Sequence, residues 1–380
     1  MSAAPPGADG MLRVGMICPY SLTIPGGVQM QVLGLARQLR RRGHEVRVLG
    51  PCDGPPPEPF VTPLGNSLPT TANGSVAPIA PDPPATLRTI RAIDHEGFDL
   101  LHLHEPLAPG PTLTAAMLHR LPTVGTFHAA GKSASYASMR WALARLINRI
   151  DVKVVVSKDA QKLVHGYLGG EFTMLFNGIE VAQIRGTEPY ERHPDREAGG
   201  PPVVFFCGRH EERKGLRVLI EAVRRMSGAV EVWIASDGPD TAELEAATDG
   251  DDRFRWLGRI SDHEKFSRLR AADVFCAPSL GGESFGVVLL EAMAAETTVV
   301  ASSIDGYRNV ATHDVDALLP EPGDPDSLAT ALERAFHDPH LTARLRSAGG
   351  DRAEDFAMTA LADRYLELYR QVVSSRFSRR

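Results

Sequence analysis

Two cations follow an apolar run in the second half of the chain, in the stretch CGRHEERKG from Cys207 to Gly215. Arg209 and Lys214 leave the carboxyl end of a predicted strand and precede a predicted helix, so free backbone N–H groups would lie beside them. Fixed cations at a helix N-terminus favour a phosphate group. The alternative is a solvated loop in which the arginine pairs with Glu211 or Glu212, because exposed ion pairs are common and weak.

A second stretch, SLGGESFGVVLLEAMA from Ser279 to Ala294, carries two glutamates. Glu283 lies in a glycine-rich turn, and Glu291 lies two helical turns further on. The glycines let a ligand lie against bare backbone, and the amides from Ser284 to Val287 would face it. A diphosphate bound there would leave one carboxylate for sugar hydroxyls and the other for a ribose. Alternatively, Glu283 compensates the helix dipole and Glu291 is a surface residue.

A third stretch, TFHAAGKS from Thr126 to Ser133, ends a strand predicted in the first half. His128 would project from the strand terminus, and Lys132 lies within reach if the chain turns at Gly131. A lone histidine is usually structural and the chain has 13 of them, so its position supports His128 more than its type does. For the histidines of LHLHEP, His102 and His104, we expect packing or orientation roles.

The residues of these three stretches would lie close together if the strands before them run parallel and end at the same edge of a sheet. From residue 11 onward, β-branched apolar runs alternate with helix-periodic segments, which is typical of βαβ units. Most of the runs are continuously apolar, as expected for parallel strands covered on both faces. The predicted strands span residues 12–18, 45–50, 99–105, 123–129, 152–157, 202–208, 230–236, 253–260, 273–279 and 298–303.

A length of 380 residues predicts two domains. A polar, Pro/Gly-rich stretch near residue 186 places the boundary, so we expect domains over 1–184 and 185–357, with a C-terminal helix (358–380) that crosses back to the first. The predicted fold class is α/β, with two doubly wound, Rossmann-like halves facing across a cleft in which ligands bind. Residues 51–84 are expected to form a functional or mobile loop bordering the active site.

Composition narrows the function classes. With 43% hydrophobic and 23% charged residues and a net charge of −6, the chain resembles a soluble globular protein and not a nucleic-acid binder. Its four cysteines are far apart and lie mostly in apolar runs, which favours small buried side chains over disulfides or metal ligands. Without a signal-peptide pattern or a long apolar run, we expect a cytoplasmic protein with at most a peripheral hold on the inner membrane face.

In this order, and with PGGVQ (Pro25 to Gln29) before them, these stretches resemble the retaining glycosyltransferases of the GT-B fold, family four. GGESFGVVLLEAMA contains the family's two glutamates separated by seven residues, and GRHEERKG and NGIE match as well. The stretches GMICPYSLTIPGGVQ, NGSVA, LHLHEP and LGGESFG resemble the actinobacterial phosphatidylinositol mannosyltransferases within that family. The resemblance implies transfer of a mannosyl residue from GDP-mannose to the inositol of phosphatidylinositol.

The resemblance also implies roles for individual residues. Arg209 and Lys214 would bind the donor diphosphate, Glu283 the sugar hydroxyls and Glu291 the ribose, with His128 near the reacting carbon. The other residues implied for the donor are Gly27 at the β-phosphate, Ser284, Phe285 and Gly286 at the glycine-rich turn, and Ile260, Asp262 and Lys265 at the base. Those implied for the acceptor wall are Tyr20, Gln29, Asn73 and Lys132.

A nucleoside diphosphate leaves readily when its developing charge is neutralised, and two cations plus a helix N-terminus supply that neutralisation. We therefore expect no essential cofactor or metal site, with a divalent cation stimulating at most. By the family's example, the acceptor attacks from the front face through an oxocarbenium-like pair, and the departing phosphate takes its proton.

The sequence departs from the family pattern in three places. In TFHAAGKS, Ala129 stands where the family commonly has a hydroxyl. Pro78 follows NGSVA where the mannosyltransferases have an arginine, and only Arg88 and Arg91 lie nearby as cations. At about 1 kcal/mol per cation near an anionic surface, this predicts weak membrane attachment. Glu296 replaces the usual glycine after EAMAA, for which we expect an effect on the helix ending rather than on catalysis.

Three alternatives stay open. The same fold could use another nucleotide sugar of the UDP-glucose type, or a different lipid or soluble polyol as acceptor. A non-catalytic nucleotide-sugar-binding scaffold is the alternative of a different class. A phosphorylase or epimerase of this architecture would need further catalytic residues that the sequence does not offer.

Overall fold

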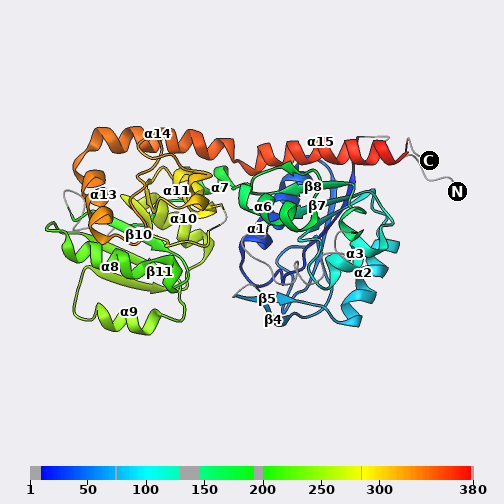
Figure 1. The fold of residues 1–380 in the computed structure, drawn as a ribbon, viewed down its shortest axis with the longest axis horizontal. Helices are drawn as coiled ribbons and strands as arrows, with labels where there is room; N and C mark the ends of the chain where they lie inside the picture. The colour runs from blue at the N-terminus through cyan, green and yellow to red at the C-terminus, as the bar shows by residue number, and fades with distance from the viewer. Residues whose placement is uncertain (1–9, 73–74, 129–144, 192–199, 284, 378–380) are drawn as a thin grey trace. The chain divides into compact units, whose positions relative to one another are not determined.

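The computed structural model describes residues 10–72, 75–128, 145–191, 200–283 and 285–377 (Figure 1). Contacts divide the chain into two compact units, here called unit 1 (residues 1–178 with 358–380) and unit 2 (179–357). The boundary expected after residue 184 falls inside α7 (Val181–Arg185), a short helix of unit 2.

Unit 1 is built on a parallel seven-stranded sheet with the order β3-β2-β1-β6-β7-β8-β9. All its neighbouring pairs are parallel, and β1 lies between β2 and β6 and pairs with both. The strands are β1 (Arg13–Ile17), β2 (Glu45–Gly50), β3 (Val61–Pro63), β6 (Leu100–His104), β7 (Thr123–Phe127), β8 (Val152–Val155) and β9 (Thr173–Met174).

Helices cover both faces of this sheet. On β1, Val14 and Met16 belong to a core cluster with α1 (Gly27–Arg41) and α15 (Met358–Phe377), whereas Ile17 belongs to a cluster on the other face. That other face packs against two helices, α2 (Pro83–His95) and α3 (Pro111–Leu118), and α6 (Lys158–Leu168) packs near β7 and β8. The sheet is therefore doubly wound, and the C-terminal helix belongs to unit 1 as expected.

The segment from residue 51 to 84 was expected to be a loop, and this was wrong for the parts of it that form β3, β4 and β5. β3 joins the edge of the parallel sheet beside β2, and β4 (Leu68–Ala72) pairs antiparallel with β5 (Ser75–Ile79). The hairpin contacts the segment after β1, since Ser21 N–H donates to the Pro78 carbonyl. The Asp53 carboxylate reinforces this contact by accepting from the Ser21 hydroxyl and from the Ser67 backbone N–H.

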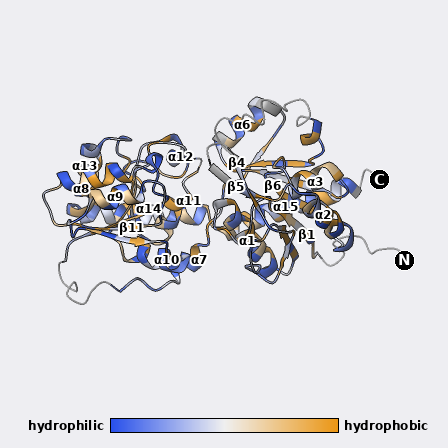
Figure 2. Ribbon diagram, turned by 90° about the horizontal axis from the view of Figure 1, so that it is seen from below, coloured by the Kyte–Doolittle hydropathy of each residue, from blue (hydrophilic) through white to orange (hydrophobic). Residues whose placement is uncertain are grey.

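Unit 2 contains a five-stranded parallel sheet with the order β12-β11-β10-β13-β14. On the central strand, Val204 and Phe206 face a core with helices α8, α13 and α14, while Phe205 contacts Trp233 and Phe275 on the opposite face. In Figure 2, α8 and α13 carry both hydrophobic and hydrophilic residues, as helices that cover one face of a sheet should.

All ten strands expected from the sequence are present, five in each unit. The strands of unit 2 are β10 (Val203–Cys207), β11 (Glu231–Ala235), β12 (Phe254–Gly258), β13 (Val274–Ala277) and β14 (Thr298–Ala301). Its longer helices are α8 (Leu216–Arg225), α9 (Thr241–Ala247), α10 (Asp262–Ala271), α11 (Val287–Ala294), α13 (Pro325–His337) and α14 (Pro339–Asp355). Within the part of the chain that is described, no helix is both long enough and apolar enough to cross a membrane.

Helix α11 ends at the glutamate that replaces the family's glycine. Glu296 has φ of 60°, in the left-handed region, and its N–H donates to the Met293 carbonyl while Thr297 N–H donates to the Ala292 carbonyl. These two bonds form a Schellman motif, whose left-handed position usually holds glycine. The Glu296 side chain is exposed, so its conformational cost is not offset by burial.

Replacing this residue should stabilise the protein. In Glu296→Gly, the removed left-handed strain exceeds the added freedom of the unfolded chain, and we expect a gain of about 0.5–1 kcal/mol, read from the urea midpoint. The matched control is Glu367→Gly at an exposed position inside α15, which should destabilise by about 1 kcal/mol. Equal destabilisation by both exchanges would contradict the strain at Glu296.

Candidate active site

In unit 2, a glutamate from the glycine-rich turn is held by two cations from the neighbouring loop. Glu283 Oε1 lies 2.6 Å from Lys214 Nζ and 3.0 Å from Arg213 Nη1. The loops follow β10 and β13, which are adjacent in the sheet, so their carboxyl ends lie at one edge. The side chains of Lys214 and Glu283 are only 18% and 14% exposed, which makes this pair stronger than a surface ion pair.

Two glycines allow these loops to approach closely. Gly215 has φ of 69°, and a Cβ there would lie 1.9 Å from the Pro278 carbonyl oxygen. A Cβ on Gly306 would lie 1.9 Å from the carbonyl oxygen of Glu283. Any side chain at either position would push the turn that carries Glu283 away, so these glycines fix the geometry of the ion pair.

Arg209 is the more accessible of the two predicted cations. Its side chain is 60% exposed, and its Nε lies 3.7 Å from Glu211 Oε2, so the ion pair considered from the sequence does form. Glu211 also pairs with Arg213 at 2.6 Å, which links Arg209 to the Glu283 cluster through a chain of charges. An exposed pair at this distance is weak and leaves the guanidinium able to bind an anion.

The N-terminus of α11 lies beside this cluster. Gly286 is its N-cap with φ of 83°, and the first turn contains no acidic residue that would compensate its free N–H groups. Phe285, expected at the donor, is 2% exposed and packs edge to face with Phe356, so its side chain is part of the core and only its backbone remains for a ligand. Ser284 lies outside the described residues.

The second predicted glutamate is paired with a predicted base-binding lysine. Glu291 is 3% exposed, and Lys265 Nζ lies 3.0 Å from Glu291 Oε1 and 3.2 Å from Asp262 Oδ1. Burial alone would lower the pKa of Lys265, but the two carboxylates outweigh burial and raise it, so the ammonium stays charged. Glu291 is thus a buried charge, and the alternative that it is a surface residue does not hold. Ile260, the other residue expected at the base, lies half-buried just before α10.

Cys207, at the end of β10, connects the two pairs electrostatically. Burial raises the pKa of its thiol to about 11, and the charges of Lys265, Glu291 and Lys214 act on it together. Among the described residues, the predicted donor residues Arg209, Lys214 and Glu283 follow the carboxyl ends of the adjacent strands β10 and β13.

In unit 1, candidate residues follow the neighbouring strands β1, β6 and β7. Glu105, buried and with φ of 48°, accepts from the backbone N–H of His128. Burial raises the pKa of the Tyr20 hydroxyl, and the nearby carboxylate of Glu105 raises it further. Tyr20 and His128 thus meet around Glu105 at the carboxyl edge of the sheet.

The glycines of PGGVQ differ in their surroundings. α1 begins at Gly27, where an added Cβ would meet nothing within 4 Å, whereas a Cβ on Gly26 would lie 2.4 Å from the Gln29 side chain. Gln29 is buried and donates to the Ser21 carbonyl at 3.3 Å. The remaining predicted acceptor residues, Asn73 and Lys132, lie outside the described residues.

His128 is half-buried and belongs to a cluster with two buried histidines, His102 and His104. Its Nε2 lies 3.0 Å from His104 Nδ1, and the rings of His104 and His102 lie 4.2 Å apart. The orientation roles expected for the two histidines of β6 agree with these contacts. Burial lowers the pKa of His102 to about 3 and that of His128 to about 4, and it lowers the pKa of His104 well below 6.5.

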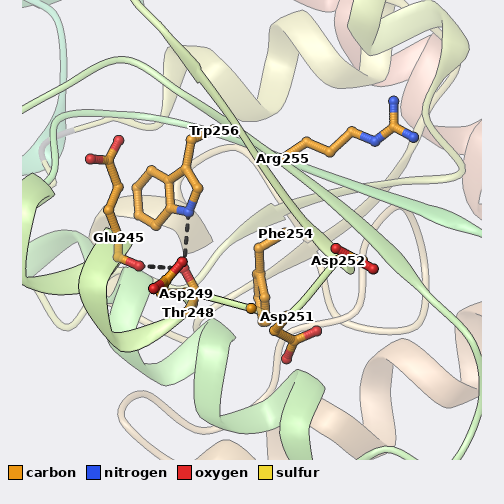
Figure 3. Close-up of a pocket in the computed structure, with 9 residues that line it drawn as sticks. Glu245, Thr248, Asp249, Asp251, Asp252, Phe254, Arg255 and Trp256 are labelled. Atoms are coloured by element: carbon orange, nitrogen blue, oxygen red, sulfur yellow. Dashed lines mark hydrogen bonds between the residues drawn. The ribbon is translucent and has the colours of Figure 1, made fainter.

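A pocket of about 600 Å³ lies elsewhere in unit 2 (Figure 3). It is lined by the end of α9 and the beginning of β12, where the Trp256 indole donates to Thr248. Because β12 runs parallel to its neighbours, this pocket lies at the amino edge of the sheet, away from Glu283 and Lys214.

Sequence reasoning missed several residues of the site. Arg213 is a third cation inside the quoted stretch GRHEERKG, so a signal for it existed. Glu105 lies in LHLHEP, where only the histidines were considered. Asn177, which hydrogen-bonds to His128, lies in NGIE, which was noted for the family resemblance only. Tyr307, whose hydroxyl lies 2.8 Å from Ser279 Oγ beneath the glycine-rich turn, had no signal in the sequence.

Comparison with known proteins agrees with this geometry. The model for "Glycosyltransferase Family 4" matches residues 25–183, and the model for "Glycosyl transferases group 1" matches residues 201–338. Among solved structures, sucrose-phosphate synthase from Thermosynechococcus elongatus aligns with a TM-score of 0.74 and 21% identity, covering 96% of this chain and 100% of that one. Anabaena HepE, solved with UDP and glucose, aligns with a TM-score of 0.73 and 19% identity over 95% of this chain and 100% of its own. The fold and the matched models define a glycosyltransferase of the GT-B class.

Relatives with higher sequence identity show the family to which the chain belongs. The phosphatidyl-myo-inositol mannosyltransferase of Mycolicibacterium smegmatis is 38% identical over 95% of this chain and 94% of its own length. The enzyme of the same name from Mycobacterium leprae is 36% identical over 96% of this chain and 98% of its own length. This chain belongs to glycosyltransferase family four.

The histidine cluster predicts an acid-sensitive fold. The unfolded chain takes up protons on these histidines near pH 6.5, whereas folded His102 and His128 stay neutral down to about pH 3 and 4. Because the unfolded state binds more protons in this window, stability is full above pH 6.5 and falls as the pH drops, by about 1.4 kcal/mol per pH unit for each fully buried histidine. The measurement is the urea midpoint between pH 4.5 and 7.5.

Two variants make this measurement specific. His102→Gln removes one buried titrating group and should flatten the pH dependence, whereas His337→Gln, at the exposed end of α13, should leave its slope unchanged. A wild-type stability that is constant from pH 6.5 to 4.5 would contradict the neutral cluster.

Proposed function

We propose that this chain transfers a mannosyl residue from GDP-mannose to the inositol of phosphatidylinositol, with retention of configuration. The observation that carries the proposal is the 38% identity with the M. smegmatis phosphatidyl-myo-inositol mannosyltransferase over 95% of the chain. The motif resemblance, which extends over nearly the whole sequence, supports the same donor and acceptor.

Leaving-group stabilisation falls to unit 2 in this proposal. Lys214 and Arg209 neutralise the diphosphate, and the free N–H groups at the start of α11 donate to its oxygens. Once Lys214 turns to the phosphate, the Glu283 carboxylate is released to accept hydrogen bonds from mannose hydroxyls. Lys214 and Glu283 thus neutralise each other in the ligand-free chain, and the bound donor becomes the new partner of both side chains.

Residues at α10 support a guanine nucleotide. Asp262 begins the helix and its side chain is 62% exposed, so its carboxylate oxygens can accept from the adjacent N–H groups of a guanine edge. Glu291 lies behind it, and its second oxygen can accept from ribose hydroxyls while Lys265 keeps it charged. Ile260 would contact the face of the base.

Membrane association is weak in this proposal. Helix α2 carries Arg88 and Arg91 together with Leu87, which is 56% exposed. The Arg88 guanidinium donates to the Leu64 carbonyl at 3.0 Å, so it is partly committed within the protein. Each remaining cation contributes about 1 kcal/mol at an anionic surface, which gives peripheral and salt-sensitive binding to the inner face.

A donor and acceptor matrix tests the proposal. The full chain is incubated with GDP-mannose or UDP-glucose, with vesicles that contain or lack phosphatidylinositol, and release of the nucleoside diphosphate is followed. We expect release only with GDP-mannose and phosphatidylinositol together. Turnover with UDP-glucose, or with a soluble polyol and no lipid, would favour the corresponding alternative, and no turnover with any pair would favour a binding scaffold.

Variants in the same assay test the assigned residues. Lys214→Ala should lower kcat about 100-fold, because a positioned donor to a developing anion contributes about 3 kcal/mol. Arg217→Ala, which removes an exposed cation on α8 paired with Glu243, is the matched control and should leave kcat unchanged. Gly27→Val should keep the melting temperature yet abolish transfer, since an added Cβ meets nothing within 4 Å and the new side chain would occupy the space proposed for the β-phosphate. Near-normal turnover in Lys214→Ala would overturn the assignment.

A further inference from the structure

Three histidine rings lie in succession inside unit 1. The side chains of His102 and His104 lie on the same face of β6. The third ring is that of His128, which comes just after the neighbouring strand β7. The ring centroids are 4.2 Å apart for the first two and 5.3 Å apart for His104 and His128. The cluster ends at the residue assigned to the sugar.

His102 is fixed from two sides. Its Nε2 lies 2.7 Å from the Thr126 hydroxyl, and its Nδ1 lies 2.7 Å from the hydroxyl of Tyr369 on α15. The Thr126 hydroxyl is in turn 2.9 Å from that of Tyr365, also on α15. The C-terminal helix therefore holds the first ring in one orientation, and His104 packs on that ring.

His104 has one bonded and one unbonded ring nitrogen. Its Nδ1 lies 3.0 Å from His128 Nε2, while its buried Nε2 has no hydrogen-bond partner among the described residues. Burial keeps both rings neutral, so each carries one proton. If His104 carried its proton on Nε2, a donor would be buried without an acceptor, which is rarer in proteins than an unused lone pair. The proton of His104 therefore lies on Nδ1 and is donated to His128.

An independent contact agrees with this direction. A hydrogen bond with the Asn177 side chain raises the pKa of His128, partly opposing burial. A bond that favours protonation is one in which the imidazole donates and the amide oxygen accepts. With Nε2 accepting from His104, the neutral His128 ring carries its own proton on Nδ1.

We propose that His104 is a positioning residue for sugar transfer: by donating its Nδ1 hydrogen to His128 Nε2, it fixes the tautomer and the ring plane of His128. This rests on the proposed function, in which His128 lies at the donor sugar. It also excludes a general-base role for His128, because the lone pair on Nε2 of the neutral ring already accepts the hydrogen of His104.

Two polar substitutions separate this role from packing. The amide of asparagine can present an N–H where the Nδ1 of histidine lies, whereas the longer glutamine places its amide where Nε2 lies. In His104→Asn, we expect His128 to keep its tautomer and kcat to stay within about threefold of wild type. In His104→Gln, we expect mixed tautomers and a kcat at least tenfold lower, with the donor KM little changed, because misorientation costs turnover more than binding.

The tautomer is read on the full chain by 15N NMR of the imidazole nitrogens, without any substrate. Tyr365→Phe removes a hydroxyl at the far end of the cluster and should lower stability without altering the His128 tautomer. An Nε2-protonated His128 in the wild-type chain would overturn the proposal, as would equal loss of kcat in the Asn and Gln variants.

The readouts also separate this inference from the proposed function. The wild-type chain could transfer no mannose and yet have a His128 that is protonated on Nδ1 and loses this tautomer only in His104→Gln. That result would refute the proposed function and support the hydrogen bond between His104 and His128. A tautomer that changes in His104→Gln with kcat unaffected would overturn the positioning role in transfer, even if mannose is transferred normally.

Discussion

The carboxylate of Glu283 is the group on which the geometry of unit 2 depends. It is largely buried and shared by Lys214 and Arg213, and a buried charge is tolerated only when it is paired and hydrogen-bonded. The pairing ties the loop after β10 to the loop after β13. The pairing also keeps a charged lysine and a charged carboxylate side by side in the site proposed for a nucleotide sugar, which contains both a diphosphate and hydroxyl groups. Both charges are already desolvated, so binding of the donor replaces the partner of each charge.

Parallel sheets explain why the candidate residues gather as they do. In each unit the chemical groups follow adjacent strands, β10 and β13 in unit 2 and β1, β6 and β7 in unit 1, and the carboxyl ends of parallel strands share one edge. The strands themselves are almost wholly buried and apolar. Polar function is thus confined to the first residues after each strand. The exceptions are the histidines of β6, of which His102 is held by Thr126 on β7 and by Tyr369 on α15.

Much of the fold could be predicted because continuous apolar runs and glycine-containing loops are local signals. The hairpin of β4 and β5 escaped prediction because Pro69 and Pro78 suggest a loop, although they lie opposite each other in a two-stranded sheet where every strand is an edge. The quoted motifs predicted Lys214 and Glu283 as residues of one donor site, but they did not predict the ion pair between them. The bond between His104 and His128 and the hydroxyl of Tyr307 under the turn depend on tertiary packing, which spacing along the chain does not encode.

The central claim is that the donor diphosphate replaces Glu283 as the partner of Lys214. A crystal structure of the chain with a bound nucleotide-sugar donor tests it most directly. The account predicts that Lys214 Nζ contacts a diphosphate oxygen, while Glu283 has left the lysine and accepts from a hydroxyl of the sugar. A donor complex in which Lys214 and Glu283 keep their 2.6 Å contact, with the diphosphate bound elsewhere, would contradict it.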